Sequence, residues 1–458
     1  MTKTSLIILA AGALALCGLF LALRPRVPGP YPGRNILVIT VDTLRPDHLG
    51  AYGYHRPTSP AIDALARRGV TFDMAFAPRG MTWPSLATML TSLSPTTTNV
   101  RWNGQYLPQG VPTMASLARE AGYETRAFLG GSICHMARAM GVFESVECGE
   151  DLYVGMTAVE FLRAKKEKPF FSWVHLMAPH APYKPPAKHD VFSSAAYKGP
   201  VGRDRFTLDQ ISAKQKALSE ADLAQLHGLY DGEVQFADQQ VGLLLATLDE
   251  QGLLGDTIIA FTADHGEDLY EHHRYLYHAC SIYDSSLRIP LILALPDDAK
   301  AGTRYSRVVE LIDLAPTLLE LAGIGRLPSF EGKSMLRRLA GSDDDDGEPG
   351  EAVAVSEWYD PDLKKSLQTV RTERWRYISN PEGLTPQCLP AGDYYKVARE
   401  ELYDHSVDPA ESRNVAAEHP QLTKWLSELT GRSSALDDAP LPVDPKLTEE
   451  LRSFGYIQ

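Results

Sequence analysis

Five side chains that could bind a metal ion or an anionic ester either follow a predicted strand or open a predicted helix. They come from four distant segments of the chain and are Asp42, Thr82, His180, Asp264 and His265. Because ligands gather outside the carboxyl ends of the strands in a parallel sheet, residues at successive strand ends are expected to meet at one edge. The sequence therefore predicts one site that combines carboxylates, imidazoles and a hydroxyl.

This set of donor atoms favours a divalent cation. Carboxylate oxygens beside an imidazole nitrogen suit calcium, manganese or zinc. We predict one such ion on Asp42, Asp264 and His265, with Thr82 as a further ligand. The ion would act as a Lewis acid on an ester of an oxyanion and would lower the pKa of a coordinated hydroxyl. The two aspartates could instead cap the turns that follow them, but without a cation they would repel each other.

Thr82 lies in the stretch RGMTWPSLATMLTSL (79–93), which has the pattern of a helix start. Pro84 falls in the first turn, and apolar residues recur at helical spacing from Leu86 onward. Two roles are open to Thr82: a helix N-cap, which is a common role of threonine, and a nucleophile. The partial positive charge and free N–H groups of a helix N-terminus would favour a sulfuryl or phosphoryl group there. The surrounding set of residues favours the nucleophile.

The elements that must position these residues alternate between strands and helices. Residues 35–41 (NILVITV) are typical of a strand buried on both faces, and residues 59–69 have the capping residue, apolar period and final glycine of a helix. Further helices are predicted at 113–121, 155–164, 219–250 and 311–323, and further strands at 124–129, 169–176, 257–262 and 290–295. This βαβ series predicts an α/β fold with a largely parallel central sheet sandwiched by helices.

The composition changes near residue 341. The acidic stretch 342–351 is interpreted as a solvated surface turn, because it lacks the ligand spacing of a calcium loop. Short strand-like runs at 352–357, 367–371 and 375–379 predict a small antiparallel sheet beyond it. We therefore predict an N-terminal segment with a Pro/Gly-rich linker (1–33), a catalytic α/β domain (34–340) and a smaller α+β C-terminal subdomain (341–458).

The composition and the N-terminus limit partners and location. The 458 residues include 58 acidic and 45 basic side chains, a net charge of -13, and no basic block, so a nucleic-acid surface is not expected. Residues 5–23 form a segment without a charged side chain. The length of this segment lies between that of a signal-peptide core and that of a membrane span. An uncleaved membrane anchor is favoured over lipidation at Cys17, because Leu16 stands where a lipoprotein signal needs a small residue. We expect the body to be membrane-anchored or exported, on the periplasmic or extracellular side.

Cysteine usage is low. Cys134 and Cys148 are close enough in sequence to close a small disulfide loop in an exported protein, and two separate buried thiols are an equally good interpretation. The chain has no CxxC pair, so no thiolate zinc site is predicted.

Several segments, taken together, resemble the sulfatase family of the alkaline phosphatase superfamily. They are VDTLRPDHLGAYGY (41–54), TWPS (82–85), APHAPY (178–183), TADHGE (262–267) and LYDHSVDPAE (402–411), with support from SPAIDALA (59–66) and LIDLAPTLL (311–319). Each motif is weak alone, but the ordered set is specific. The resemblance implies an alkaline phosphatase-like fold and a metal enzyme that cleaves sulfate or phosphate esters through a covalent intermediate.

The resemblance also implies roles for individual residues. Asp42, Asp264 and His265 match metal-ligand positions. Thr82 matches the nucleophile, and His180 matches a histidine that contacts the transferred group or the leaving oxygen. Lys184 and His278 lie in loops that carry substrate-binding residues in relatives.

Three positions depart from the family pattern. Sulfatases have a Cys or Ser that is oxidised to formylglycine where this chain has Thr82, and an arginine where it has Leu86. Thr43 stands where many sulfatases have a second metal-binding Asp. The methyl group on the threonine Cβ prevents oxidation to an aldehyde, so no formylglycine is expected. Another cation, with Lys184 as the candidate, would have to replace the missing arginine.

These departures from the family pattern affect which ester the protein is expected to cleave. An unmodified hydroxyl resembles the nucleophile of relatives that act on phosphorus, so phosphoryl chemistry is slightly favoured on mechanism. The alternatives are a sulfatase without formylglycine, a phosphoethanolamine- or phosphoglycerol-type transferase, and a non-catalytic binding protein on a degenerate sulfatase fold. The expected substrate is a small-molecule, glycan or lipid ester.

Other polar residues near the motifs have a simpler interpretation. His175, within a predicted strand, is expected to be a packed core histidine. Glu233, on a long predicted helix, is expected to cap or pair structurally. A solvated, mobile loop is expected to contain Glu267, Asp268, His272 and His273.

Overall fold

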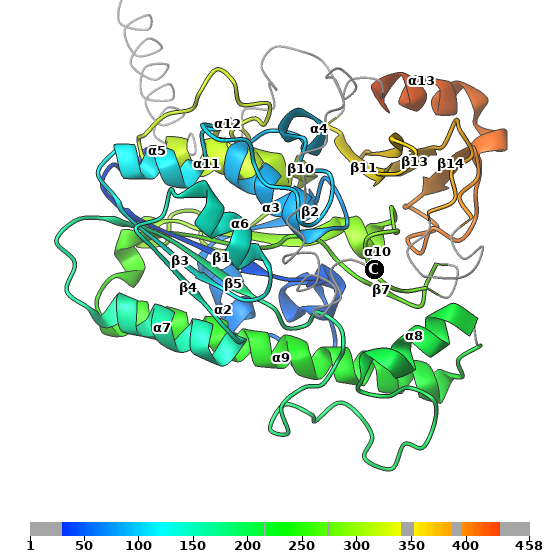
Figure 1. The fold of residues 1–458 in the computed structure, drawn as a ribbon, viewed down its shortest axis with the longest axis horizontal. Helices are drawn as coiled ribbons and strands as arrows, with labels where there is room; N and C mark the ends of the chain where they lie inside the picture. The colour runs from blue at the N-terminus through cyan, green and yellow to red at the C-terminus, as the bar shows by residue number, and fades with distance from the viewer. Residues whose placement is uncertain (1–29, 215–216, 273–274, 340–351, 387–395, 431–458) are drawn as a thin grey trace, which may run out of the picture.

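The structure is a computed structural model that describes residues 30–214, 217–272, 275–339, 352–386 and 396–430 (Figure 1). The predicted membrane anchor at 5–23 and the acidic turn at 342–351 lie outside these residues. In the part of the chain that the structure describes, no helix combines the length and apolar character needed to cross a membrane.

An eight-stranded sheet forms the centre of the molecule, in the order β10-β2-β9-β6-β1-β5-β3-β4. The strands are β1 (Asn35–Val41), β2 (Val70–Phe76), β3 (Glu124–Leu129), β4 (Ser145–Cys148), β5 (Phe170–Leu176), β6 (Thr257–Ala263), β9 (Arg288–Ala294) and β10 (Thr303–Glu310). All run parallel except β9, which is antiparallel to both of its neighbours. The predicted largely parallel sheet is confirmed, and β9 is its one antiparallel strand among the described residues.

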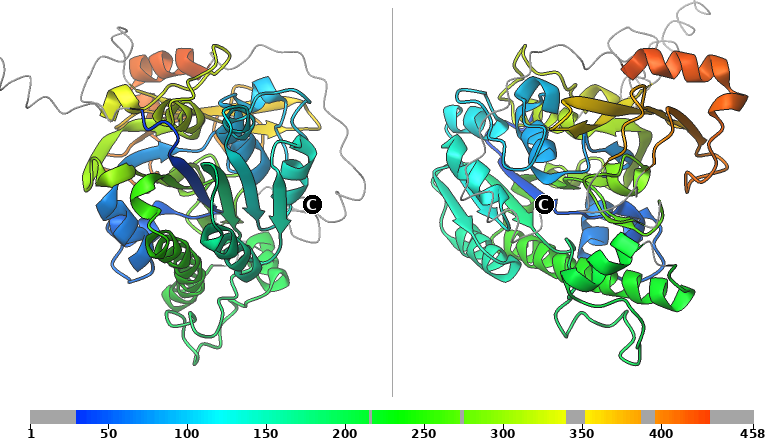
Figure 2. Two further views of the ribbon diagram at one scale, coloured as in Figure 1. Left: turned by 90° about the vertical axis from the view of Figure 1, so that its left-hand side faces the viewer. Right: turned by 45° about the vertical axis from the view of Figure 1, so that its right-hand side comes forward.

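Helices cover both faces of this sheet (Figures 1 and 2). On one face, α9 (Glu220–Glu250) packs against α2 (Pro60–Arg68) and α7 (Asp151–Arg163). On the other face lie α3 (Thr82–Thr91), α5 (Met114–Glu120), α6 (Ile133–Met140) and α11 (Leu314–Leu321). The central strands β1, β5 and β6 are buried along their whole length, because their apolar side chains contact helices on both sides.

A second, antiparallel sheet forms the C-terminal part, as predicted. Its strands are β11 (Ala354–Asp360), β12 (Lys365–Arg371), β13 (Trp375–Ser379) and β14 (Glu400–Asp404), followed by α13 (Pro420–Thr430). Strand β11 lies against the central domain, where Glu357 N donates to Pro78 O at 2.9 Å and Arg101 Nη2 pairs with Glu357 Oε2 at 3.0 Å. The domain boundary predicted at 341 falls outside the described residues and stays a prediction.

Cys134 and Cys148 form a disulfide, with Cα atoms 6.1 Å apart. The bond joins α6 to strand β4 at the edge of the central sheet. The sequence left open a disulfide or two separate buried thiols, and the structure shows the disulfide.

Candidate active site

The candidate site begins where two neighbouring parallel strands end. Val41, the last residue of β1, pairs with Ala263, the last residue of β6, so Asp42 and Asp264 leave the sheet side by side. Thr43 N donates to Asp264 Oδ1 at 3.2 Å, and the Thr43 carbonyl accepts from Tyr230 OH at 2.7 Å. These bonds hold Thr43 in a left-handed conformation, with φ of 56°. The turn after β1 is thereby fixed against the turn after β6.

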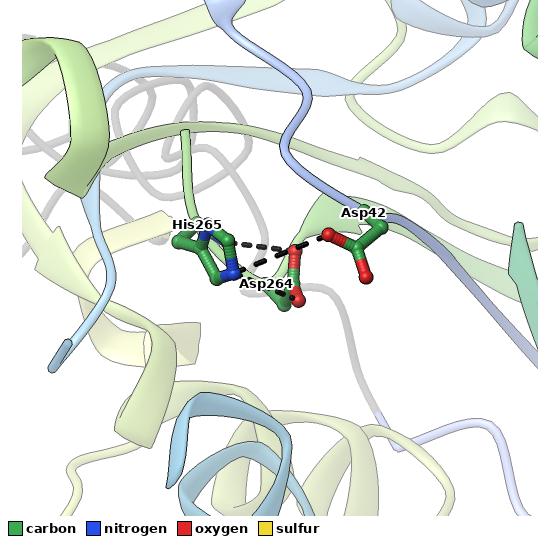
Figure 3. Close-up of side chains that lie close together, drawn as sticks. All are labelled: Asp42, Asp264 and His265. Carbon is green, nitrogen blue, oxygen red and sulfur yellow. Dashed lines mark hydrogen bonds and ion pairs between the residues drawn. The ribbon is translucent and has the colours of Figure 1, made fainter. Parts of the chain in front are cut away.

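Asp42, Asp264 and His265 form a buried cluster in which one donor atom from each lies within 4.8 Å of the others (Figure 3). His265 Nδ1 donates to Gly266 O at 2.8 Å, and its Nε2 lies 3.4 Å from Asp264 Oδ2. A side chain at Gly266 would collide with the Ser285 carbonyl oxygen, so glycine is required beside His265. The three donor atoms therefore converge from a rigid frame.

The residues of this cluster fit a divalent cation. Asp42 Oδ1 and Asp264 Oδ2 are buried and accept no hydrogen bond within the described residues. Burial raises the pKa of Asp42 well above its usual value, and the neighbouring Asp264 adds to this shift. Two neighbouring buried carboxylates, each with one oxygen that accepts no hydrogen bond, are costly unless a positive charge compensates them. The cluster is thus a possible metal site for one hard or borderline divalent ion.

Thr82 lies beside this cluster and does not act as the N-cap of α3. The N-cap position is Met81, and Thr82 is the first residue of the helix. Thr82 Oγ1 lies 3.5 Å from Asp42 Oδ2 and 3.4 Å from His265 Nε2. The first turn is held from outside, because Asn103 Oδ1 accepts from Trp83 N at 2.9 Å. The Thr82 hydroxyl therefore points to the possible metal site, and the N-cap alternative is wrong.

His180 and His278 extend the site from His265. The ring centroids of His265 and His278 are 4.5 Å apart, and those of His278 and His180 are 5.1 Å apart. His180 Nδ1 donates to Ala181 O at 2.7 Å. In the neutral ring Nε2 then carries the lone pair. Burial lowers the pKa of both His180 and His278 well below the usual value. Both rings are thus neutral near neutral pH.

Glu267 is a site residue that sequence reasoning missed. Glu267 and Asp268 are fully buried, and His272 stacks on Tyr283, so the expectation of a solvated loop is wrong for these three. Glu267 Oε1 accepts from His278 Nδ1 at 3.0 Å. Burial raises the pKa of Glu267 to about 8, although His265 opposes this shift. The available signal was its position two residues after His265. His273 lies outside the described residues.

His175 is fully buried, as predicted, and its Nδ1 lies 2.8 Å from Thr40 Oγ1. Its Nε2 lies 3.5 Å from Asp42 Oδ2, so it also contacts a site carboxylate, which the sequence did not indicate. His175 thus packs behind Asp42, on the side of the sheet core.

Leu86 stands where the family has an arginine, and Lys184 is the candidate cation to replace it. The Lys184 side chain is exposed, and its backbone N–H donates to Glu233 Oε1 at 2.8 Å, which confirms a structural pairing for Glu233. Leu86 is fully buried in the main hydrophobic core, one helical turn after Thr82. A charged side chain would therefore be costly at position 86 in this packing.

A second cluster of possible ligands joins Asp284, His405 and Glu411. Arg376 already pairs with both acids, with Nε 2.6 Å from Glu411 Oε1. Although burial alone would raise the pKa of Asp284, Arg376 and Arg371 lower it. These guanidinium groups take the place that a cation would need, so the cluster is an ion-pair network between the two sheets.

The architecture is that of a solved sulfatase and of a solved phosphonate monoester hydrolase. A solved 2-O GAG sulfatase superposes with a TM-score of 0.71 and 23% identity, covering 91% of this chain and 96% of that one. The phosphonate monoester hydrolase of Agrobacterium radiobacter gives a TM-score of 0.68 and 21% identity, with coverage of 87% and 95%. At these identities the likeness concerns the fold.

The sequence comparisons give the family. The sulfatase family model matches residues 34–324, and the model of the N-sulphoglucosamine sulphohydrolase C-terminal region matches residues 271–437. The chain is 26% identical to the Delta 4,5-hexuronate-2-O-sulfatase of Bacteroides thetaiotaomicron over 472 residues, which covers 93% of this chain and 91% of the relative. It is 25% identical to mouse arylsulfatase K, with coverage of 81% and 73%. The chain belongs to the sulfatase family, and the resemblance seen in its motifs is confirmed.

Proposed function

We propose that this sulfatase-family hydrolase cleaves an anionic ester with the unmodified hydroxyl of Thr82 as its nucleophile. The observation that carries the proposal is the position of Thr82 Oγ1, at 3.5 Å from Asp42 and 3.4 Å from His265, on the first residue of a helix. At that point the helix N-terminus and a bound cation would both stabilise negative charge on the ester.

The proposed reaction has two half-reactions. In the first, Thr82 Oγ1 forms a bond to the phosphorus or sulfur atom, and the bond from that atom to the alcohol oxygen breaks. We assign the passage of the proton from Thr82 to the departing oxygen to Nε2 of His180, whose ring is neutral. In the second, a water oxygen bonds to the transferred group, the bond to Thr82 breaks and Oγ1 regains a proton. An acceptor alcohol in place of water would make the enzyme a transferase.

Asp42, Asp264 and His265 would hold one divalent ion, either calcium, manganese or zinc, in this proposal. When bound, such an ion supplies Lewis-acid stabilisation of the ester oxygens and of the ionised hydroxyl. His278 would contact the substrate between the possible metal site and His180, since its ring lies between those of His265 and His180. We also propose Lys184 as a substrate-binding residue, on the resemblance alone.

Phosphoryl transfer is the favoured chemistry, because a phosphothreonine can be released by direct attack of water on phosphorus. The solved phosphonate monoester hydrolase shows that this fold hosts phosphorus chemistry in another protein. Sulfate ester hydrolysis is the second candidate, and the relatives named as sulfatases favour it. Under either chemistry a glycan, lipid or small-molecule ester is the proposed substrate.

A panel of substrates with purified protein tests the proposal. We expect the wild type to turn over phosphate mono- or diesters faster than the matching sulfate esters, and Thr82→Ala to lose at least about 1,000-fold in kcat. Thr82→Ser, which keeps the hydroxyl, should retain measurable turnover. Faster sulfate turnover would reject the phosphoryl preference, and full activity in Thr82→Ala would reject the nucleophile.

A non-catalytic binding protein is less well supported. Loss of the family arginine and of the formylglycine precursor motivates it, but the carboxylates and His265 are present and converge. We propose that the protein is exported or membrane-anchored, and the Cys134–Cys148 disulfide supports this location. Labelling of thiols with and without a reductant after purification from the native compartment would test it, since a reduced pair would oppose export.

A further inference from the structure

Arg205 places a positive charge beside the histidine end of the candidate site. It is the first residue of α8 (Arg205–Lys214), a helix that packs against β8 (Leu276–Tyr277). Its guanidinium carbon lies 4.1 Å from the ring centroid of Tyr277, the residue that precedes His278. Strand β8 pairs with β7 (Asp268–Leu269), which begins next to Glu267. The guanidinium is therefore held at the hairpin that carries two site residues.

The Arg205 guanidinium retains donors for a ligand. Its Nε pairs with Asp209 Oδ1 at 3.2 Å, and the side chain is 34% exposed. Asp209 is held in turn by Tyr277 OH, at 2.7 Å. Within the described part of the chain, neither Nη group of Arg205 donates to another residue. A half-exposed pair within one helix contributes little free energy, so an anion can be bound without a large loss.

The charge of Arg205 acts on the histidine end of the site. Burial is the main cause of the low pKa of His180 and of His278, and the charge of Arg205 adds to both shifts. The largest effects of charge on the pKa of Asp42 are instead those of Asp264, His265, Glu267 and Asp151. Together with its position over the Tyr277 ring, this places the charge of Arg205 near the histidine end of the site. In the proposed reaction that end holds the leaving alcohol.

We propose that Arg205 binds an anionic group on the alcohol part of the substrate. The group is a carboxylate or a second sulfate or phosphate, for which a planar guanidinium supplies two parallel N–H donors. The inference rests on the proposed function, because it takes the histidine end of the site as the place of the leaving alcohol. It assigns a substrate class: esters of alcohols that carry a further negative charge. The protein has a net charge of -13, so a local cation of this kind matters for anionic substrates.

Paired ligands that differ only in this charge test the inference. The probes are two aryl phosphate esters with a carboxylate or a carboxamide at the same ring position, the corresponding sulfate esters, and the two free phenols. A second pair, with a sulfate or a methyl ether at that position, separates a second sulfate from a carboxylate. The variants are Arg205→Gln and Arg205→Lys. Arg203→Gln is the matched control, because Arg203 pairs with Asp190, is similarly exposed and carries the same charge.

We expect the wild type to prefer the charged member of a pair in kcat/KM, and Arg205→Gln to lose roughly 10- to 100-fold on that member alone. Arg205→Lys should recover part of the loss, and Arg203→Gln should leave the preference intact. Equal losses on both members, or no preference in the wild type, would overturn the inference.

Binding of the free phenols separates this inference from the proposed function. Calorimetric titration with the phenols needs no turnover. If no ester is hydrolysed but the charged phenol binds the wild type more tightly than Arg205→Gln, the anion site stands and the proposed reaction fails. If the charged phenol binds both proteins equally, the anion site is rejected whatever the activity.

Discussion

At the scale of residues, the site is organised by what the histidine Nδ1 atoms contact. His265 and His180 donate from Nδ1 to backbone carbonyls, and His278 shares its Nδ1 with the Glu267 carboxyl. Each bond fixes the ring and leaves Nε2 as the functional atom. A consistent orientation of three adjacent imidazoles is what a site needs to hold a cation at one end and a leaving oxygen at the other.

Glu267 is predicted to act through His278. Glu267→Leu removes the acceptor for Nδ1 and should lower kcat/KM by about 10- to 100-fold, in the range found for partners that orient functional histidines. Glu267→Gln keeps an acceptor oxygen and should recover most of the loss. Steady-state kinetics with both variants measure the effect, and thermal unfolding checks that they fold. Equal kcat/KM in Glu267→Leu and the wild type would show that His278 needs no such partner.

The sequence was sufficient to predict that Asp42, Thr82, Asp264 and His265 lie close together, because each stands next to a recognisable strand end or helix start. The sequence could not show that Glu267 is buried. A short polar segment predicts an exposed loop unless the residues that surround it in space are known. His175 was predicted to be buried, but its contact with Asp42 depends on the register of β1 and β5. Contacts between segments more than a hundred residues apart have no local signal.

At the scale of elements, the strands of the sheet centre were predictable and the outer ones were not. The apolar runs of β1, β5 and β6 indicate burial on both faces. Edge strand β10 (TRYSRVVE) is polar and largely exposed, and edge strand β4 has only four residues, so neither carries the same signal. The direction of β9 could not be predicted, because its apolar sequence RIPLILA indicates a buried strand but not whether that strand is parallel or antiparallel.

The start of α2 is held by Asp238 on α9, which accepts from Ala61 N at 3.1 Å and Ile62 N at 2.8 Å. Burial raises the pKa of Asp238 to about 6, above the value of about 3.9 in an unfolded chain. The folded state therefore binds its proton more tightly, and stability is lost as this carboxyl ionises between about pH 4 and pH 6.

Asp238→Asn should remove this pH dependence. We expect the free energy of unfolding of the wild type, minus that of the variant, to fall as pH rises from 4 to 7. Urea unfolding at several pH values measures it, and other titrating groups cancel in the difference. A difference that is constant, or that grows with pH, would contradict the assignment.

At the scale of the whole molecule, the C-terminal sheet is joined to the central domain by buried ion pairs. Glu357 on β11 faces Arg101 at 3.0 Å and Arg79 at 3.8 Å. Burial lowers the pKa of Arg79 to about 10, although Glu357 opposes this shift. Arg79 precedes Thr82 by three residues, so this junction lies next to the start of α3. The second sheet thus supports the segment that carries the proposed nucleophile.

Glu357→Gln should destabilise the protein by about 3 kcal/mol, because it leaves two buried guanidinium groups without their counter-charge. Glu382→Gln is the control: its pair with Lys365 is about half exposed and should contribute little to stability. Denaturant unfolding followed by tryptophan fluorescence compares them. Equal stabilities of the two variants would show that the junction does not depend on Glu357.

The central claim is that Thr82 carries the transferred group, and a trapped adduct tests it most directly. The protein is mixed with excess ester, quenched in acid within the first turnovers, digested and analysed by peptide mass spectrometry. We predict a phosphoryl group, or a sulfuryl group with sulfate esters, on Thr82 in the peptide that contains residues 79–93, and none in Thr82→Ala. Turnover with an unmodified Thr82 at every quench time, together with full activity in Thr82→Ala, would contradict it.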